Sequence, residues 1–204
     1  GRSIVGRSEA EGKRRGLDPA PGAGPRTFQR VQPDKDMSRY AVISDIHGNL
    51  YAFQAVLSRM ASLEIDEVIC LGDIVGYGPN PGDCLDLVVK YCAHIIQGNH
   101  DEAVVDPYCA DTFNGAAREA IYWTRDAIGP LHLNALNLLR PTLRIGPSIM
   151  CVHSSPDANG PTDYVHDKQV AALAFRGVDA PICLLGHTHV PMVFEGPGEN
   201  DDTP

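Results

Sequence analysis

Five short motifs in this sequence combine carboxylate, amide and imidazole side chains, which are groups that bind divalent metal ions. In chain order they are Ser44-Asp-Ile-His47, Gly72-Asp73, Gly98-Asn-His-Asp101, Val152-His153 and Gly186-His-Thr-His189. They supply the candidate site residues Asp45, His47, Asp73, Asn99, His100, His153, His187 and His189. Carboxylates together with imidazoles suit Mn, Fe, Zn, Co or Ni better than Ca or Mg. The motifs therefore predict a site for borderline divalent ions.

The number of candidate ligands favours two ions over one. Each motif alone is a weak indicator, because Asp-x-His, Gly-Asp and His-x-His also occur in ordinary polar loops. All of them in one chain give enough donors for two metals about 3.5–4 Å apart, with one carboxylate bridging the pair. The glycines before Asp73, Asn99 and His187 allow the backbone to approach closely at these points.

The motifs follow short apolar runs that predict strands. The runs are 40–44, 67–71, 94–97 and 182–185, and apolar residues at helical spacing separate the first three, over 50–60 and 82–91. Strands alternating with helices indicate parallel pairing and right-handed crossovers. Loops beyond the carboxyl ends of such strands converge on one crevice, so we expect the motifs to meet there.

The middle of the chain predicts more helix and then a hairpin. Asn114 can cap a helix, and Tyr122 and Trp123 on that helix are expected to make core or cap contacts. The further expected elements are a helix over 131–139, a hairpin of 142–145 with 149–152, a short helix over 168–175 and a strand over 192–194.

Composition limits the partners and the compartment. The chain has 204 residues, which suits one domain, and a net charge of −9, which argues against binding duplex nucleic acid. No apolar run approaches the roughly 20 residues that span a bilayer, and the N-terminal residues lack the apolar core of a secretory signal. The six cysteines show no CxxC spacing, so reduced thiols are favoured over disulfides or a zinc site. We expect a cytoplasmic protein without a membrane partner.

The chain divides into three parts by composition. Residues 1–36 are rich in Gly, Pro, Arg and Lys, and we interpret them as a disordered extension or tag, with Met37 as the natural start. Residues 37–195 form the expected domain, and 196–204 a flexible polar tail.

The order of the motifs resembles the calcineurin-like metallophosphoesterase superfamily over residues 37–195. The segments ISDIHGN, GDIVGYGPNP and GNHD are most similar to those of its small prokaryotic predicted phosphodiesterases. The resemblance implies a metal-dependent phosphoesterase with an α/β fold, a four-layer α/β/β/α sandwich. Only residues 192–194 are left for the last part of its second sheet, so that sheet is expected to be incomplete and the protein to be a possible oligomer.

The resemblance also implies a role for each candidate residue. Asp45, His47, Asp73 and His189 would hold one metal, and Asp73, Asn99, His153 and His187 the other, with Mn expected and Asp73 bridging. A hydroxide shared by the metals would attack phosphorus in line with the leaving group. His100 would be a general acid or a charge stabiliser. Asp101 either orients the His100 imidazole or is a solvated loop carboxylate.

One departure from the superfamily bears on the substrate. Its protein phosphatases and dinucleoside tetraphosphatases carry an arginine soon after the Gly-Asp motif, whereas residues 72–78 and 101–117 contain none. Because arginine is the natural clamp for a phosphate dianion, we expect a phosphodiester of a small or nucleotide-like molecule. The alternatives are a phosphomonoesterase or nucleotide-polyphosphate hydrolase, including a protein-phosphatase-like activity, and a non-catalytic scaffold. Tyr77, Asn80 and Tyr164 either border the cleft or only pack in loops.

Overall fold

The computed structural model describes residues 38–157 and 164–196. The predicted disordered segment over 1–36 lies outside these residues, and so does the predicted flexible tail over 196–204 apart from its first residue.

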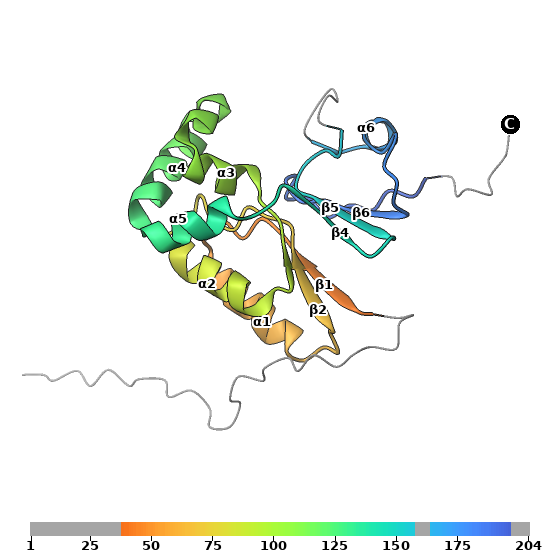
Figure 1. The fold of residues 1–204 in the computed structure, drawn as a ribbon, viewed down its shortest axis with the longest axis horizontal. Helices are drawn as coiled ribbons and strands as arrows, with labels where there is room; N and C mark the ends of the chain where they lie inside the picture. Colours follow the sequence, from red (N-terminus) through yellow and green to blue (C-terminus); the bar gives the residue numbers. More distant parts are fainter. Residues whose placement is uncertain (1–37, 158–163, 197–204) are drawn as a thin grey trace, which may run out of the picture. The chain divides into compact units, whose positions relative to one another are not determined.

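The first sheet holds three parallel strands, as the alternating pattern predicts. They are β1 (Tyr40–Ile43), β2 (Glu67–Cys70) and β3 (His94–Ile95), in the order β1-β2-β3. Helix α1 (Leu50–Met60) connects β1 to β2, and α2 (Pro81–Tyr91) connects β2 to β3 (Figure 1). Ile43 pairs with Cys70, so the carboxyl ends of β1 and β2 are level. The loops that follow them therefore leave the sheet at the same edge.

Local chemistry explains where the two connecting helices begin and which face they bury. The Asn49 side chain accepts a hydrogen bond from the Ala52 N–H and caps α1, which buries Phe53 and Met60. Pro81 opens α2 in its first turn, where no intrahelical N–H is needed. Cys84, Leu85 and Val88 form the buried face of α2.

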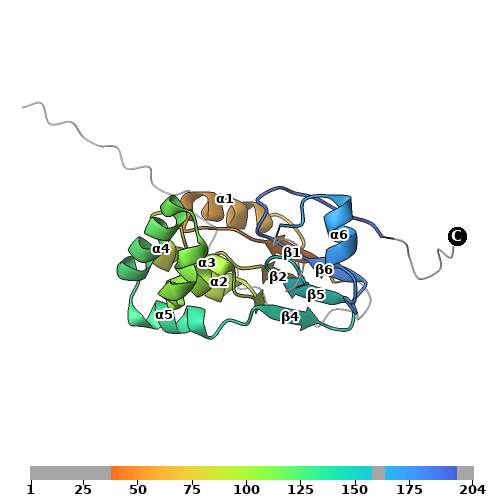
Figure 2. The same cartoon turned by 90° about the horizontal axis from the view of Figure 1, so that it is seen from above.

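Four helical segments directly follow the first sheet, and two of them, over 99–105 and 107–112, were not predicted. They are α3 (Asn99–Val105), the 3₁₀ helix η1 (Pro107–Thr112), α4 (Gly115–Ala127) and α5 (Pro130–Asn137). We expected Asn99 and His100 in a loop, but they form the first turn of α3. Acidic residues in that turn, Asp101 and Glu102, favour a helix start through the macrodipole. In Figure 2, α3, α4 and α5 lie together, far from α6 (Lys168–Ala174).

The inner face of α4 differs from one part of the prediction. Ala117, Ile121 and Thr124 are buried, at the i, i+4, i+7 spacing of one helical face. Tyr122 and Trp123 are 42% and 49% exposed, so the expectation of core or cap contacts for them was wrong. The adjacent positions Ile121 and Thr124 already fill the inward stripe, which turns the two aromatic side chains outward.

The second sheet also has three strands within the described residues. The predicted hairpin is present as β4 (Thr142–Ile145) antiparallel to β5 (Ile149–Val152), and β6 (Ile182–Leu184) pairs parallel with β5. Helix α6 lies between β5 and β6 in the chain, and the Asp167 carboxylate caps it. The strand expected over residues 192–194 is absent, since this segment pairs with no other strand among the described residues.

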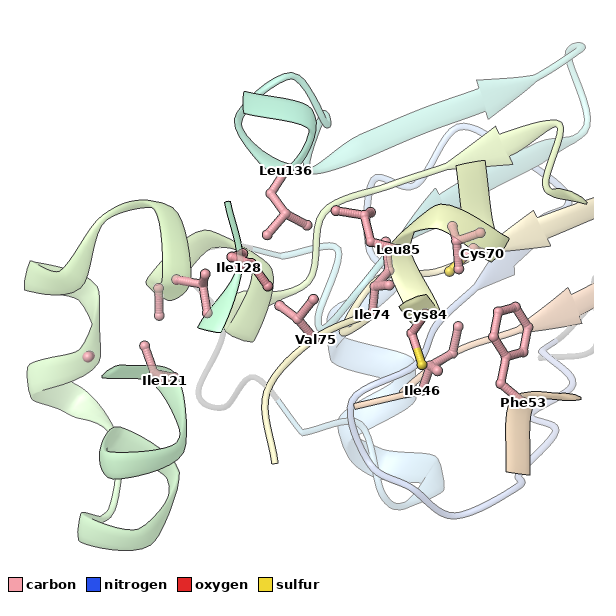
Figure 3. Close-up of a cluster of buried hydrophobic side chains, with 14 residues drawn as sticks. Ile46, Phe53, Cys70, Ile74, Val75, Cys84, Leu85, Ile121, Ile128 and Leu136 are labelled. Atoms are coloured by element: carbon pink, nitrogen blue, oxygen red, sulfur yellow. The ribbon is translucent and has the colours of Figure 1, made fainter. Parts of the chain in front are cut away.

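Three apolar clusters join these elements into the mixed α/β, two-sheet architecture that the resemblance implies. Figure 3 shows the largest cluster, in which α1, α2 and the later helices cover one face of the first sheet. A second cluster includes Ile69 of β2, Ile96 just after β3, and Cys151 of β5, so the two sheets pack face to face. A third joins α6 to Leu185 and Phe194.

The six cysteines are free, as the absence of CxxC spacing predicted. Within residues 38–157 and 164–196, no helix is long and apolar enough to cross a membrane.

Candidate metal centre

All five predicted motifs meet at the strand ends. Asp45 and His47 follow β1, Asp73 follows β2, and Asn99 and His100 open α3 just after β3. His153 directly follows β5, and His187 and His189 follow β6. Both sheets therefore contribute to one site.

The side chains form three overlapping groups of potential metal donors. The first group is Asp45, His47 and His189. The second is His47, Asp73 and His100, and the third is Asp73, His153 and His187. Within each group the donor atoms lie within 4.8 Å of one another. Asp73 and His47 each belong to two groups. The central position of Asp73 is what a carboxylate bridging two ions requires.

Backbone strain coincides with the candidate ligands. In the described residues, positive φ at non-glycine positions occurs at Asp45, His47, Asp73, His187 and His189. Such angles cost free energy for residues with a Cβ and persist where the surrounding structure holds them. Here hydrogen bonds from Asp45 N to Gly72 O (3.1 Å) and from His47 N to Asp73 O (2.9 Å) tie the first two loops together. This concentration of strain marks the cluster as a functional site.

Backbone carbonyls orient two of the imidazoles. His47 Nδ1 lies 3.1 Å from Val75 O, and His153 Nδ1 lies 2.7 Å from Leu71 O. A carbonyl only accepts, so Nδ1 of each ring carries a proton, and each ring presents a lone pair at Nε2 once that nitrogen is deprotonated. Those Nε2 atoms lie 3.5 Å and 3.3 Å from Asp73 Oδ2. This is the usual arrangement of a metal-binding histidine with its outer hydrogen bond.

Buried polar atoms at the site test whether the residues fit a metal. Asn99 Oδ1, His100 Nδ1 and His153 Nε2 are buried and have no hydrogen-bond partner within the described part of the chain. Leaving such an atom unpaired costs about 1–3 kcal/mol. A divalent cation would satisfy the amide oxygen of Asn99 and the imidazole nitrogen of His153. The donor set therefore fits metal ions.

Asp73 and the buried histidines shift one another's pKa values. Burial opposes charge on both members of the Asp73–His153 pair, yet their attraction lowers the pKa of Asp73 and raises that of His153 to about 9. Their 3.3 Å contact acts through charge, since His153 Nε2 lacks hydrogen-bond geometry toward the carboxylate. Burial lowers the pKa of His47, and lowers that of His100 to about 4 despite the nearby Asp73.

Asp101 has neither of the roles considered for it from sequence. It is fully buried, and its Oδ1 accepts hydrogen bonds from the N–H groups of Ile74 (2.9 Å) and Val75 (3.1 Å). Its Oδ2 accepts from Gly98 N at 3.0 Å. The carboxylate therefore fastens the loop after β2 to the start of α3. The reciprocal bond runs from His100 N to Asp73 Oδ1 at 2.9 Å.

Burial, followed by the charge of Asp73, raises the pKa of Asp101 to about 7. The available sequence signal for this function was an acidic residue three positions after Gly98, the N-cap residue of α3.

Aromatic rings border the cluster. The ring of Tyr77 lies 4.9 Å from that of His47 and 4.7 Å from that of His100, and Phe113 lies 4.9 Å from His100. The Tyr164 ring lies 4.2 Å from that of His187. Tyr77 and Tyr164 thus border the site, whereas Asn80 precedes the first turn of α2. The remaining histidines pair elsewhere, His94 with Glu67, His132 with Asp86 and His166 with Asp167.

The family model of the calcineurin-like phosphoesterases matches residues 38–191, which include every residue of the site. The chain belongs to the calcineurin-like phosphoesterase family. This confirms the resemblance, and the two-sheet α/β architecture agrees with it.

Relatives of this calcineurin-like phosphoesterase come from prokaryotes. It is 40% identical to a metallophosphoesterase from Sphaerobacter thermophilus, with a TM-score of 0.65, over 76% of this chain and 62% of that one. It is 35% identical to an uncharacterized protein of Methanocaldococcus jannaschii, over 76% of this chain and 64% of that protein. A hypothetical protein from Pyrococcus horikoshii shares the fold, with 23% identity and a TM-score of 0.62 over 73% of this chain and 69% of that one. The chain thus matches less than two thirds of the length of the first two relatives.

Proposed function

We propose that this calcineurin-like phosphoesterase is an enzyme that hydrolyses phosphodiesters at a centre of two divalent metal ions. The observation that supports this most directly is the pair of donor groups on either side of Asp73, one with His47 and the other with His153 and His187. One carboxylate shared between two sets of imidazoles matches the composition of a dinuclear site.

The donor groups suggest how the ligands divide between the ions. Asp45, His47, Asp73 and His189 would hold one ion, and Asp73, Asn99, His153 and His187 would hold the other. Manganese is our first choice, with Fe, Zn, Co or Ni as other candidates, because the site mixes imidazole and carboxylate donors. When bound, such ions polarise the phosphoryl oxygens and lower the pKa of water.

The protein's own residues hold this arrangement rigid. The carbonyls of Val75 and Leu71 fix the rings of His47 and His153, so that both Nε2 atoms are aimed at Asp73. The His187 N–H donates to both oxygens of Asp45, at 3.0 and 3.2 Å. A site with fixed donors needs little reorganisation as charge develops on the phosphoryl group.

His100 acts in this proposal as a charge stabiliser. Burial lowers its pKa to about 4, so its imidazole is neutral at pH 7 and has one N–H to donate. The ring is 5% exposed and belongs to the donor group of His47 and Asp73, within reach of a phosphate ester bound there. A neutral N–H can stabilise negative charge that builds on the ester oxygens without a full proton transfer.

The lack of a basic clamp beside the donor groups, among the residues that the structure describes, favours diesters over monoesters. Within the described residues, the ion pairs of Asp45 and Asp73 are made with histidines alone. Arg125 is partly buried, and its guanidinium donates to the carbonyls of Val104 and Val105. A monoester dianion gains most from a bidentate arginine, whereas a diester carries a single negative charge.

Parallel hydrolysis assays test this function. Metal-stripped protein is re-supplied with Mn and given bis-p-nitrophenyl phosphate or the corresponding monoester, alongside a His100→Ala variant. We expect Mn-dependent turnover, faster with the diester, and a loss of roughly 100-fold or more in kcat in the variant, as for removal of one charge-stabilising donor.

Each other outcome supports one of the alternatives. A preference for the monoester would indicate a phosphomonoesterase or nucleotide-polyphosphate hydrolase. If folded wild-type protein turns over substrate no faster than His100→Ala with any divalent ion, the protein is a non-catalytic scaffold and the proposal is wrong.

A further inference from the structure

Two tyrosines from different parts of the fold lie against the metal centre. Tyr77 belongs to the loop between β2 and α2, and Tyr164 to the segment between β5 and α6. Tyr77 contacts the rings of His47 and His100, with an edge-on orientation toward His47. Tyr164 lies over His187 with only 31° between the ring planes. Each tyrosine therefore packs on an imidazole of the candidate site.

Neither tyrosine is buried by these contacts. Tyr77 is 50% exposed and Tyr164 is 52% exposed, while the neighbouring His47 and His100 are buried. The two imidazoles that Tyr77 contacts belong to a donor group with Asp73, and the His187 imidazole that Tyr164 contacts belongs to another donor group with Asp73. The tyrosines thus lie between the buried donors and solvent, where the organic part of a bound ester would emerge.

We propose that Tyr77 and Tyr164 form a subsite for a planar ring of the substrate, namely the base of a nucleotide-like phosphodiester. This inference rests on the proposed function and adds the substrate class and the residues that select it. Exposed aromatic faces bind nucleobases by stacking, which is worth about 1–3 kcal/mol per base and tolerates any base. Since no arginine in the described part of the chain pairs with Asp45 or Asp73, such stacking would supply binding free energy that the phosphate group alone does not.

The test must separate stacking by the tyrosine rings from hydrogen bonding by their hydroxyl groups. A phenol O–H could instead donate to a phosphoryl oxygen. Replacement by phenylalanine removes the hydroxyl and keeps the aromatic face, whereas replacement by leucine removes the face and keeps much of the apolar volume. Stacking predicts that Tyr77→Phe and Tyr164→Phe behave like the wild type and that the leucine variants do not.

Equilibrium binding of two matched ligands tests the subsite. Adenosine monophosphate and ribose phosphate share the sugar and the phosphate and differ in the base, and calorimetry with Mn-loaded protein measures the Kd of each. We expect Tyr77→Leu and Tyr164→Leu each to raise the Kd for adenosine monophosphate by roughly 5- to 100-fold. The Kd for ribose phosphate should not change. Tyr108→Leu is the control, since Tyr108 is 86% exposed on η1 and contacts none of the candidate ligands through its ring among the described residues.

The contrary results separate this inference from the proposed function. If bis-p-nitrophenyl phosphate is hydrolysed but adenosine monophosphate binds the wild type no more tightly than ribose phosphate, the base subsite is wrong and the phosphodiesterase stands. Equal weakening of both ligands in the leucine variants, or loss of base preference in the phenylalanine variants, would also overturn stacking. Absence of hydrolysis and of binding by either ligand would overturn both.

Discussion

At the scale of single residues, the features that lower stability and the features that suggest chemistry are found together. Asp45, Asp73 and three of the site histidines have positive φ, and Asn99 and His153 present buried atoms without hydrogen bonds among the described residues. Backbone strain and buried polar atoms without hydrogen bonds are tolerated where the rest of the fold holds them and a function uses them. The site is thus stabilised from outside, by residues that do not themselves bind the ions.

Asp101 is such a residue, and its replacement tests that function. Asp101→Asn puts an amide N–H₂ opposite either the Gly98 N–H or the N–H groups of Ile74 and Val75. A buried donor facing a donor costs about 1–3 kcal/mol, so we expect a loss of that size in the free energy of unfolding by urea. We also expect a lower kcat with little change in KM, since Asp73 and His100 lose their relative position.

Asp106→Asn is the matched control for that variant. Asp106 is exposed and caps η1 through its bond from Tyr108 N, a function that asparagine performs equally well. Stability and kcat of this control should equal those of the wild type. An Asp101→Asn protein that is as stable and as active as the control would show that the carboxylate does not position the site.

The Asp73–His153 pair predicts how the metal-free protein responds to pH. The pKa of His153 rises from 6.5 in the unfolded chain to about 9 in the fold, through its attraction to Asp73 against the cost of burial. The folded state thus keeps a proton that the unfolded chain releases, so this contribution is complete below pH 6.5 and is lost as the pH rises through about 9. In metal-free protein, the free energy of unfolding should fall over that interval.

A His153→Gln variant isolates that contribution. Its urea-unfolding free energy should show a smaller fall over the same pH interval, because glutamine does not titrate. Equal slopes for the wild type and the variant would show that His153 is not charged beside Asp73.

At the scale of the elements, close backbone contacts hold the metal-binding loops together. A Cβ at Gly98 would overlap the backbone N and the Oδ1 atom of Asp73, although the φ of Gly98 is an ordinary −92°. At Gly76, φ is +119° and a Cβ would lie 2.7 Å from His100 Nδ1. Gly98 is thus required because an added Cβ would clash with Asp73. Gly76 is required both because an added Cβ would clash with His100 and because of its positive φ.

The contact at Gly98 gives a prediction for the junction of β3 and α3. Gly98→Ala should lower the free energy of unfolding by about 1–3 kcal/mol through overpacking and reduce the amount of metal bound, because Asp73 must move. Gly115→Ala, at the start of α4 with no atom within 4 Å of the added Cβ, should be neutral or stabilising. Urea unfolding and elemental analysis of both variants measure this, and equal behaviour would contradict the contact.

The elements also show what sequence patterns predict and what they miss. The strands β1, β2 and β6 and the hairpin β4–β5 were predictable, because each is a short apolar run bounded by turn residues or a motif. Helix α3 was missed because its first turn consists of the polar residues that also form the site. For Asp101, the local bond from Gly98 could be predicted, but the bonds from Ile74 and Val75 could not, since these residues lie 27 and 26 positions away.

At the scale of the whole molecule, the site joins the two sheets. Asp45, His47 and Asp73 follow strands of the first sheet, whereas His153, His187 and His189 follow strands of the second. Among the described residues, a small buried apolar cluster of Ile69, Leu71, Ile96 and Cys151 lies between the sheets. Metal ions bound to both sets of ligands would therefore add a link between the sheets.

That link predicts a large effect of metal removal on stability. A ligand present at 100 times its Kd stabilises the folded state by about 2.7 kcal/mol, so chelation should lower Tm by several degrees. His94→Ala removes a histidine that pairs with Glu67 away from the site, and its Tm should respond to chelation as the wild type does. A Tm that is unchanged by chelator and by added Mn would contradict metal binding across the sheets.

The central claim is that the predicted residues form one centre for two metal ions. Elemental analysis after equilibration of stripped protein with Mn, and removal of unbound ion, measures this without reference to any substrate. The account predicts two Mn per chain in the wild type and none held tightly in Asp73→Ala, because both ions share that carboxylate. One Mn per chain or fewer in folded wild-type protein, or two in Asp73→Ala, would contradict it.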